Sequence, residues 1–223
     1  MELEKKEGIV VKSFNYQENK RIITIFTEDG LLSLVAKVYQ NNPSSNLLTT
    51  PLCVGEFFYK KSSSQLHTLK EGSVFSSYRS YNTSYPHLET AFSFLETLLS
   101  SQMPEKPAPL LYRLLKLYLE KLPTFSNPKT LSSSFILKTL RHEGLLPLEG
   151  LCSSCETLPT QAFFQKEAYC KACMPLHSLY FEENEWQQFQ MLLFSKDLKN
   201  LENLSCEELL HQKIHTLFKE SLD

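Results

Sequence analysis

Short runs of β-branched and aromatic residues dominate the first eighty positions of the chain, and polar turns separate them. The pattern predicts strands at residues 8–11, 21–27, 31–38, 54–60 and 65–69, with the last extending toward Tyr78. Asp29-Gly30 lies between two of these runs and is the expected sequence of a tight hairpin turn. Five short strands without a helix of comparable length favour a small closed β-barrel such as an OB-fold.

The hydrophobic period changes to that of helices after Pro86. Helices are predicted at residues 88–99, 110–122, 130–141, 182–194 and 206–222. Ser205 with Glu208 three residues later predicts a capping box at the start of the last helix. The predicted fold class is therefore α+β, with an OB-fold β-barrel in residues 1–80 and a helical domain in residues 81–223.

Two Cys-x-x-Cys pairs interrupt the helical region. They are Cys152 with Cys155 and Cys170 with Cys173, and fourteen residues separate the pairs. Two such pairs can supply the four sulfur ligands of a tetrahedral zinc ion, and four sulfurs leave no open position for a substrate. We therefore expect a structural zinc module at about residues 148–180, inserted into the helical domain.

Three other interpretations of these cysteines fit the sequence less well. Disulfides need an oxidising compartment, and the N-terminus lacks an apolar signal segment. A dithiol redox site needs one pair beside a strand–helix unit, which two pairs in a loop-like stretch fit poorly. A catalytic zinc deaminase could use His87 and Glu89, but Leu151 and Tyr169 stand where its motif requires proline.

Composition and charge narrow the class of protein. The chain has 223 residues, of which 42% are hydrophobic and 22% charged, as in soluble globular proteins. No apolar run approaches the roughly 20 residues of a membrane span, so a cytoplasmic protein without a membrane partner is expected. The net charge of −2 argues against a protein that simply coats nucleic acid, and residues 181–223 form an acidic end. Because the sequence has no phosphate-binding loop, we expect no nucleotide hydrolysis.

Two stretches of the chain resemble the RecO family of bacterial DNA repair proteins. The more specific one runs from Leu137 through Gly144 and Pro147 into Cys152. The N-terminal one comprises residues 7–12, Tyr16, Glu18, residues 25–30 and residues 35–37. Together with the second cysteine pair, the resemblance covers nearly the whole chain.

The resemblance implies a non-enzymatic mediator of recombination. RecO-like proteins have an N-terminal OB-fold, bind single- and double-stranded DNA and anneal complementary strands. With RecR they help to load the RecA recombinase onto DNA coated by single-strand-binding protein (SSB), and they bind the acidic, phenylalanine-ended tail of SSB. A bacterial cytoplasmic, nucleoid-associated protein is therefore expected.

Such a role assigns candidate residues to two surfaces. An OB-fold binds a strand with cations for phosphates and exposed aromatic rings for base stacking. The DNA-binding candidates on the barrel are Lys12, Phe14, Tyr16, Lys20, Arg21, Lys37, Tyr39, Lys60 and Lys61. The candidates in the helical domain, for the SSB tail or for DNA, are Arg113, Lys116, Lys129, Lys138 and Arg141.

The loop from Gln40 to Thr50 departs from the family. It contains no Arg or Lys, whereas relatives commonly carry several there. Phosphate neutralisation governs both affinity and its salt dependence, so we expect weak, salt-sensitive DNA binding with few ion contacts. A zinc-ribbon and OB-fold adaptor that binds RNA or assists transcription remains the alternative function.

Overall fold

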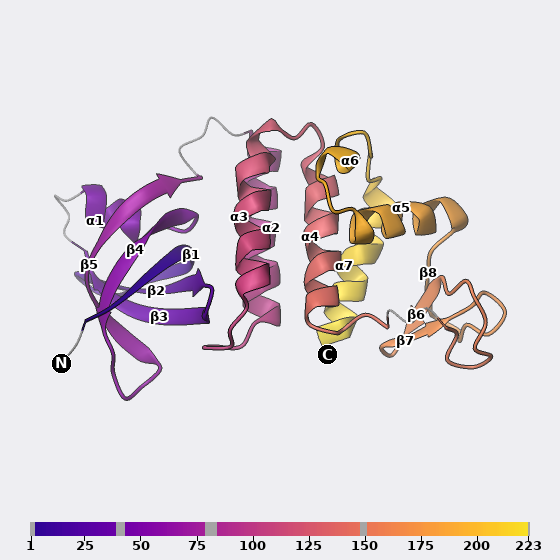
Figure 1. The fold of residues 1–223 in the computed structure, drawn as a ribbon, viewed down its shortest axis with the longest axis horizontal. Helices are drawn as coiled ribbons and strands as arrows, with labels where there is room; N and C mark the ends of the chain where they lie inside the picture. The colour runs from indigo at the N-terminus through magenta and orange to yellow at the C-terminus, as the bar shows by residue number, and fades with distance from the viewer. Residues whose placement is uncertain (1–2, 39–42, 79–83, 148–150, 223) are drawn as a thin grey trace. The chain divides into compact units, whose positions relative to one another are not determined.

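The computed structural model describes residues 3–38, 43–78, 84–147 and 151–222. It divides into two compact units, Met1–Pro123 and Thr124–Asp223, drawn in Figure 1. The predicted domain boundary between residues 80 and 81 lies outside the described residues.

A closed five-stranded barrel forms the first part of the N-terminal unit (Figure 1). Its strands are β1 (Leu3–Gln17), β2 (Lys20–Thr27), β3 (Gly30–Lys37), β4 (Cys53–Lys60) and β5 (Leu66–Ser77). They follow the order β1-β2-β3-β5-β4 around the barrel, and only the β3–β5 pairing is parallel. The predicted OB-fold barrel is confirmed.

Every second side chain along the strands points inward, and these side chains fill the barrel interior. Ile23 and Ile25 on β2, Leu34 on β3 and Phe57 on β4 are fully buried in one apolar cluster. Because side chains on a strand alternate between its two sides, the intervening residues of β2 and β3 face outward.

A short helix lies in the segment that the sequence predicted to be a polar loop. This helix, α1 (Pro43–Leu48), packs Leu48 against the backbone of β4 and β5. A Cβ atom at Gly72 would lie 2.6 Å from the carbonyl oxygen of Glu56 and 2.7 Å from Leu48 Cδ2. The glycine therefore allows the helix and the strand pair to approach closely.

One end of the barrel is closed by the chain that joins two helices, α2 (Tyr85–Ser101) and α3 (Pro109–Lys121). The Glu105 N–H donates to Leu31 O at 3.0 Å, and the Ala108 N–H donates to Glu28 O at 3.0 Å. Gly30 has φ of +100°, a backbone conformation that favours glycine. A Cβ atom there would also lie 2.3 Å from Lys106 O, so the lack of space requires glycine as well.

The helix α3 also packs on the outer side of the barrel. The ring of Tyr112 makes an edge contact with the ring of Phe26 on β2, with centroids 6.0 Å apart. One outer end of β2 is therefore covered by α3 and is not available to a ligand. A short 3-10 helix, η1 (Leu122–Thr124), follows α3.

The second unit surrounds the buried helix α4 (Pro128–His142). Its other elements are β6 (Ala162–Phe164), β7 (Glu167–Tyr169), β8 (Leu179–Tyr180), α5 (Glu183–Phe194), α6 (Lys199–Glu202) and α7 (Glu208–Leu222). Small buried hydroxyls link the helices, because Ser134 Oγ donates to Leu192 O at 2.6 Å and Ser133 Oγ shares a hydrogen bond of 2.8 Å with His211 Nδ1.

The predicted capping box of the last helix is wrong. The helix α7 begins at Glu208, so Ser205 lies too far before it to be its N-cap, and Ser205 Oγ instead accepts a hydrogen bond from Asn127 Nδ2 at 3.3 Å. A capping bond is present at α5, where the Glu182 N–H donates to the Glu185 carboxylate at 2.8 Å.

None of the helices in the described residues combines the length and the apolar character needed to cross a bilayer.

Candidate nucleic-acid interface and metal centre

Three neighbouring strands of the barrel bring predicted DNA-binding residues together on one outer face. Lys12 and Phe14 on β1 lie opposite Thr24 and Ile22 on β2. Residues that pair across strands point to the same side of a sheet. We call this surface the lysine face and define it as Lys12, Phe14, Lys20, Ile22, Val35 and Lys37, because Ile22 pairs with Val35 and Lys20 pairs with Lys37 across β2 and β3.

The cations of the lysine face are available to a ligand. Among the described residues, none of Lys12, Lys20 and Lys37 lies in an ion pair with a carboxylate. The side chain of Phe14 is 46% exposed, and Lys12 Nζ lies 6.0 Å from the centre of its ring. The face therefore offers unpaired positive charge around an accessible aromatic ring.

Two loops frame this face. Residues 18–19 join β1 to β2, and Tyr16, which is 54% exposed, precedes them. Residues 61–65 join β4 to β5. In OB-folds the faces of the second and third strands and these two loops form the usual site for oligonucleotides.

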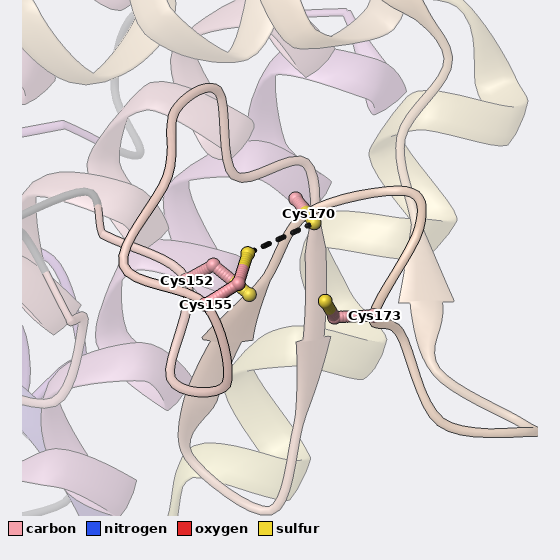
Figure 2. Close-up of side chains that lie close together, drawn as sticks. All are labelled: Cys152, Cys155, Cys170 and Cys173. Atoms are coloured by element: carbon pink, nitrogen blue, oxygen red, sulfur yellow. Dashed lines mark hydrogen bonds between the residues drawn. The ribbon is translucent and has the colours of Figure 1, made fainter.

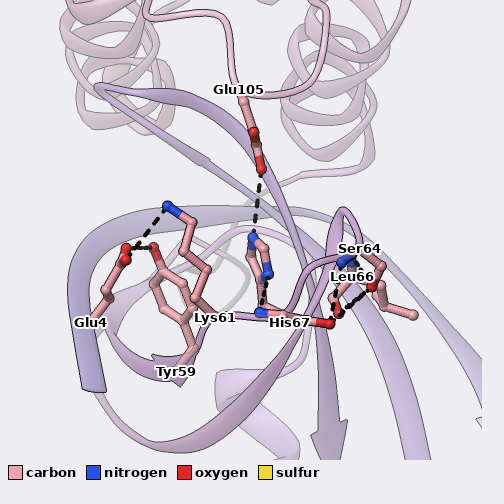
Figure 3. Close-up of polar contacts among 8 residues, drawn as sticks. Glu4, Tyr59, Lys61, Ser64, Leu66, His67 and Glu105 are labelled. Atoms are coloured by element: carbon pink, nitrogen blue, oxygen red, sulfur yellow. Dashed lines mark hydrogen bonds and ion pairs between the residues drawn. The ribbon is translucent and has the colours of Figure 1, made fainter. Parts of the chain in front are cut away.

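The loop between β4 and β5 is held by a buried histidine that the sequence analysis did not select (Figure 3). The Ser62 N–H donates to His67 Nδ1 at 3.1 Å, and the His67 ring stacks on Tyr59 with centroids 5.5 Å apart. His67 Nε2 lies 3.5 Å from Glu105 Oε1. The only signal for His67 in the sequence is the alternation along its strand, which places the residue on the inward side of β5.

Tyr59 extends the same network to β1. The Tyr59 hydroxyl donates to Glu4 Oε2 at 2.7 Å. Burial, followed by this bond to Glu4, raises the pKa of Tyr59 well above its usual value, so the hydroxyl stays protonated.

Three other predicted cations and one predicted aromatic residue remain to be placed. Arg21 is on the opposite side of β2 from Ile22, and its guanidinium donates to Asn15 Oδ1 at 3.2 Å and Thr49 Oγ1 at 3.1 Å. Lys60 continues the outer row from Val35 through Thr68. Lys61 lies 3.6 Å from Glu4. Tyr39 lies outside the described residues.

Arg113 and Lys116 on α3 are used within the N-terminal unit. Arg113 Nε lies 3.3 Å from Glu28, and Lys116 Nζ lies 2.8 Å from Glu7. The hydrogen bond from Lys116 holds the pKa of Glu7 below its usual value. These pairs line a cleft of about 580 Å³ that also holds Lys6 and its partner Asp29. Because its charges are already paired, this cleft is a poorer anion site than the lysine face.

The three remaining predicted cations lie in the second unit. Lys129 forms an ion pair with Glu208. Lys138 Nζ donates to Ser195 O at 2.7 Å, and burial lowers its pKa to about 8. The Arg141 guanidinium lies 5.0 Å from the centre of the Phe194 ring, and Phe194 is 49% exposed. Arg141 is thus the cation of this group that lies beside an exposed apolar ring.

The four predicted metal ligands converge (Figure 2). The sulfur atoms of Cys152, Cys155, Cys170 and Cys173 all lie within 4.8 Å of one another, and those of Cys155 and Cys170 are 3.7 Å apart. Zinc–sulfur bonds of about 2.3 Å in a tetrahedron place sulfurs about 3.8 Å apart, so the cluster has the right size for a metal ion. All six cysteines are free thiols, so the structure contains no disulfide.

The electrostatics of the cluster also fit a cation. The backbone N–H of Cys170, with help from those of Ser154 and Cys155, lowers the pKa of Cys152 to about 6. Hydrogen bonds with Cys155 and Cys170 raise the pKa of Cys173 to about 12. Such a spread arises when several thiols share a pocket, and a divalent cation would stabilise all four as thiolates.

The deaminase interpretation requires an open position on the metal for a catalytic water. His87 lies on α2, where its Nδ1 shares a 2.7 Å hydrogen bond with Ser84 Oγ. The four cysteines could supply a complete tetrahedral ligand set without a histidine, and such a set would leave no open position for catalytic water.

An aromatic cluster fastens the cysteine module to α5. The module contains a three-stranded sheet of order β7-β6-β8. Phe163 on β6 lies 5.9 Å from Phe189 and 6.2 Å from Trp186 on α5, measured between ring centroids. The strands were not predicted, because they have only two or three residues and their hairpin turn uses Gln165 and Lys166 at positive φ instead of glycine.

Comparison with known proteins agrees with these features. Residues 1–78 match the family model described as "Recombination protein O N terminal". The "DNA repair protein RecO" of Chlamydia pneumoniae is 29% identical over 197 residues, which cover 87% of this chain and 78% of the relative. The protein of the same name from Chlamydia trachomatis serovar L2 is 27% identical over 223 residues, covering 96% and 90% of the two chains. That of Clostridium acetobutylicum is 33% identical over 165 residues, covering 70% and 64%. The chain, with its N-terminal OB-fold barrel, helical part and four-cysteine cluster, belongs to the RecO family of DNA repair proteins.

Proposed function

We propose that this protein is a non-enzymatic recombination mediator that binds DNA on the lysine face. It binds single- and double-stranded DNA, anneals complementary strands, and with RecR helps to load RecA onto SSB-coated single strands. The observation that supports it best is the set of lysines without carboxylate partners in the described structure, Lys12, Lys20 and Lys37, around the exposed ring of Phe14. In a member of this family, such a face suits a nucleic-acid strand.

The lysine face would contact both parts of a strand. The ammonium groups of Lys20 and Lys37 would neutralise phosphates, while Phe14 and Tyr16 would stack on bases, each stack contributing roughly 1–3 kcal/mol. A strand held by few charges exchanges readily, and ready exchange suits annealing. The protein would act in the bacterial cytoplasm, at the nucleoid.

The second proposed partner is the acidic C-terminal tail of SSB. Arg141 offers a cation directly over Phe194, and Met191 on the same helix as Phe194 is 47% exposed. A terminal phenylalanine could pack on these apolar side chains while its carboxylate binds the guanidinium. This places the tail on α4 and α5.

The proposed metal is a structural zinc ion. Cys152, Cys155, Cys170 and Cys173 would hold it as thiolates, and the closed ligand set would give it no part in a reaction. Its role is to hold two loops that have little apolar core of their own.

The test is annealing of two complementary strands, bare and SSB-coated, with and without the protein. Faster annealing of both, lost in the variant Lys20→Ala/Lys37→Ala, supports the proposal. If neither kind of strand responds at low salt, the proposal fails. Preference for RNA together with indifference to SSB would favour the alternative adaptor function.

A further inference from the structure

A polar depression lies at the end of the barrel beside the loop that joins β1 to β2. It has a volume of about 570 Å³, within the range of small-ligand pockets. The residues that line it include four with amide side chains, Asn15, Gln17, Asn19 and Asn46. The exposed Tyr16 lines it as well, and so does Lys20 of the lysine face, so the depression adjoins that face.

Apart from Lys20, which belongs to the lysine face, the charges around this depression do not suit a phosphate. Lys20 and Arg21 contribute positive charge, but Glu18 stands in the same wall. Arg21 is already engaged, because its guanidinium donates to Asn15 Oδ1 and to Thr49 Oγ1. A carboxylate and a committed guanidinium favour a neutral ligand with its own donors and acceptors over an anion.

Amide side chains match the edge of an unpaired nucleobase. A side-chain amide carries a donor and an acceptor side by side, as the Watson–Crick edge of a base does. Arg21 fixes the Asn15 carbonyl oxygen, which leaves its NH₂ group as the donor for a ligand. In a duplex these base edges are occupied by the complementary strand.

We propose that this depression, lined by Asn15, Gln17, Asn19 and Asn46, is a pocket for an unpaired nucleobase. It rests on the proposed DNA-binding function and adds to it a means of distinguishing single strands from duplexes. The lysine face holds the backbone of either form, whereas the pocket accepts a base only when that base has no partner. Tyr16 at its edge can stack on the inserted or the adjacent base.

The test uses the full chain and the double variant Gln17→Ala/Asn19→Ala, because both residues are exposed. We measure affinity for a single strand, for the same strand with abasic positions, and for the duplex. The variant should bind the single strand at least tenfold more weakly and the duplex with unchanged affinity. Wild type should prefer the intact to the abasic strand, and the variant should not.

The control variant is Lys12→Ala/Lys37→Ala, which changes the lysine face outside the pocket. It should weaken single-strand and duplex binding by the same factor. The pocket is disproved if Gln17→Ala/Asn19→Ala binds the single strand like wild type, or loses single-strand and duplex affinity equally. If wild type binds neither form of DNA, the proposed function fails and the pocket fails with it.

Discussion

Lys20 on β2 and Lys37 on β3 lie directly opposite each other, so two like charges share one cross-strand pair. Such a pair destabilises a sheet by roughly 0.2–1 kcal/mol. A fold that keeps this repulsion is well suited to receive an anion between the two ammonium groups.

The first prediction separates stability from binding at this pair. Lys37→Ala should leave the free energy of unfolding unchanged or raise it by a few tenths of a kcal/mol, since it removes the repulsion. The same variant should bind single-stranded DNA more weakly. Urea unfolding and fluorescence anisotropy measure the two effects. Lys5→Ala is the matched control, because Lys5 is paired with Glu56 at 2.6 Å and should affect DNA binding little. A drop in both stability and affinity for Lys37→Ala would contradict the prediction.

The second prediction concerns salt. If Lys12, Lys20, Lys37 and Lys60 supply the phosphate contacts, log K for a single strand should fall with log [salt] with a slope of about −3. Removing Lys20 and Lys37 together should make the slope shallower by about 1.4. A wild-type slope steeper than about −6 would mean that many more cations reach the DNA.

The third prediction concerns the metal. Cys152→Ser and Cys170→Ser should each release zinc, which metal analysis of the purified protein measures. Trp186 is the only tryptophan of the chain and lies beside Phe163 of the module, so its fluorescence should change when the metal is lost. Cys206→Ala should keep the metal, since Cys206 does not belong to the cluster. Wild type purified without metal, with the same fluorescence as the variants, would contradict the assignment.

The fourth prediction concerns the SSB tail. Arg141→Ala should weaken binding of a peptide with the tail's acidic, phenylalanine-ended sequence by about tenfold, because charge-assisted hydrogen bonds to a carboxylate would be lost. Phe194→Ala should weaken it as well. Arg113→Ala is the control, since its guanidinium is paired with Glu28. Equal loss in Arg113→Ala and Arg141→Ala would indicate nonspecific attraction of the peptide.

The fifth prediction concerns pH and His211. Burial, and then the neighbouring His215, lower the pKa of His211 to about 4. The unfolded chain binds a proton at this residue below about pH 6.5, whereas the folded chain does so only near pH 4. Between these values the unfolded state binds more protons, so stability falls as pH falls.

The effect can be isolated by a variant. Between pH 7 and pH 5 the loss should be about 1 kcal/mol after allowance for the partial exposure of the ring. Trp186 fluorescence in urea reports the second unit, to which both residues belong. His211→Asn, which can keep the hydrogen bond to Ser133, should lose less stability over the same range. An equal loss in both proteins would show that other groups cause it.

The barrel was predictable because its signals are local. Alternation along β2 and β3 and the turn at Asp29-Gly30 fix which side chains face outward, and hence the lysine face. The start of β1 was missed because residues 3–7 are mostly polar and are held by pairing with β4 rather than by an apolar pattern.

The partners of the predicted cations were not predictable. Arg113 and Lys116 pair with Glu28 and Glu7, which lie 85 and 109 positions earlier in the chain. Nothing near either residue in the sequence distinguishes it from Lys20 or Lys37, which have no carboxylate partner in the described part of the chain. The cysteine pairs were predictable, in contrast, because their spacing alone brings two sulfurs to one centre.

The cysteine module begins after α4 and ends before α5, and these two helices are joined independently of it by bonds such as that from Ser134 Oγ to Leu192 O. The two helices therefore stay in contact with each other whether or not the four sulfurs hold a metal. Loss of the ion should loosen the cysteine module while the helices stay folded. Sequence changes within the module should therefore have little effect on the folding of the rest of the molecule.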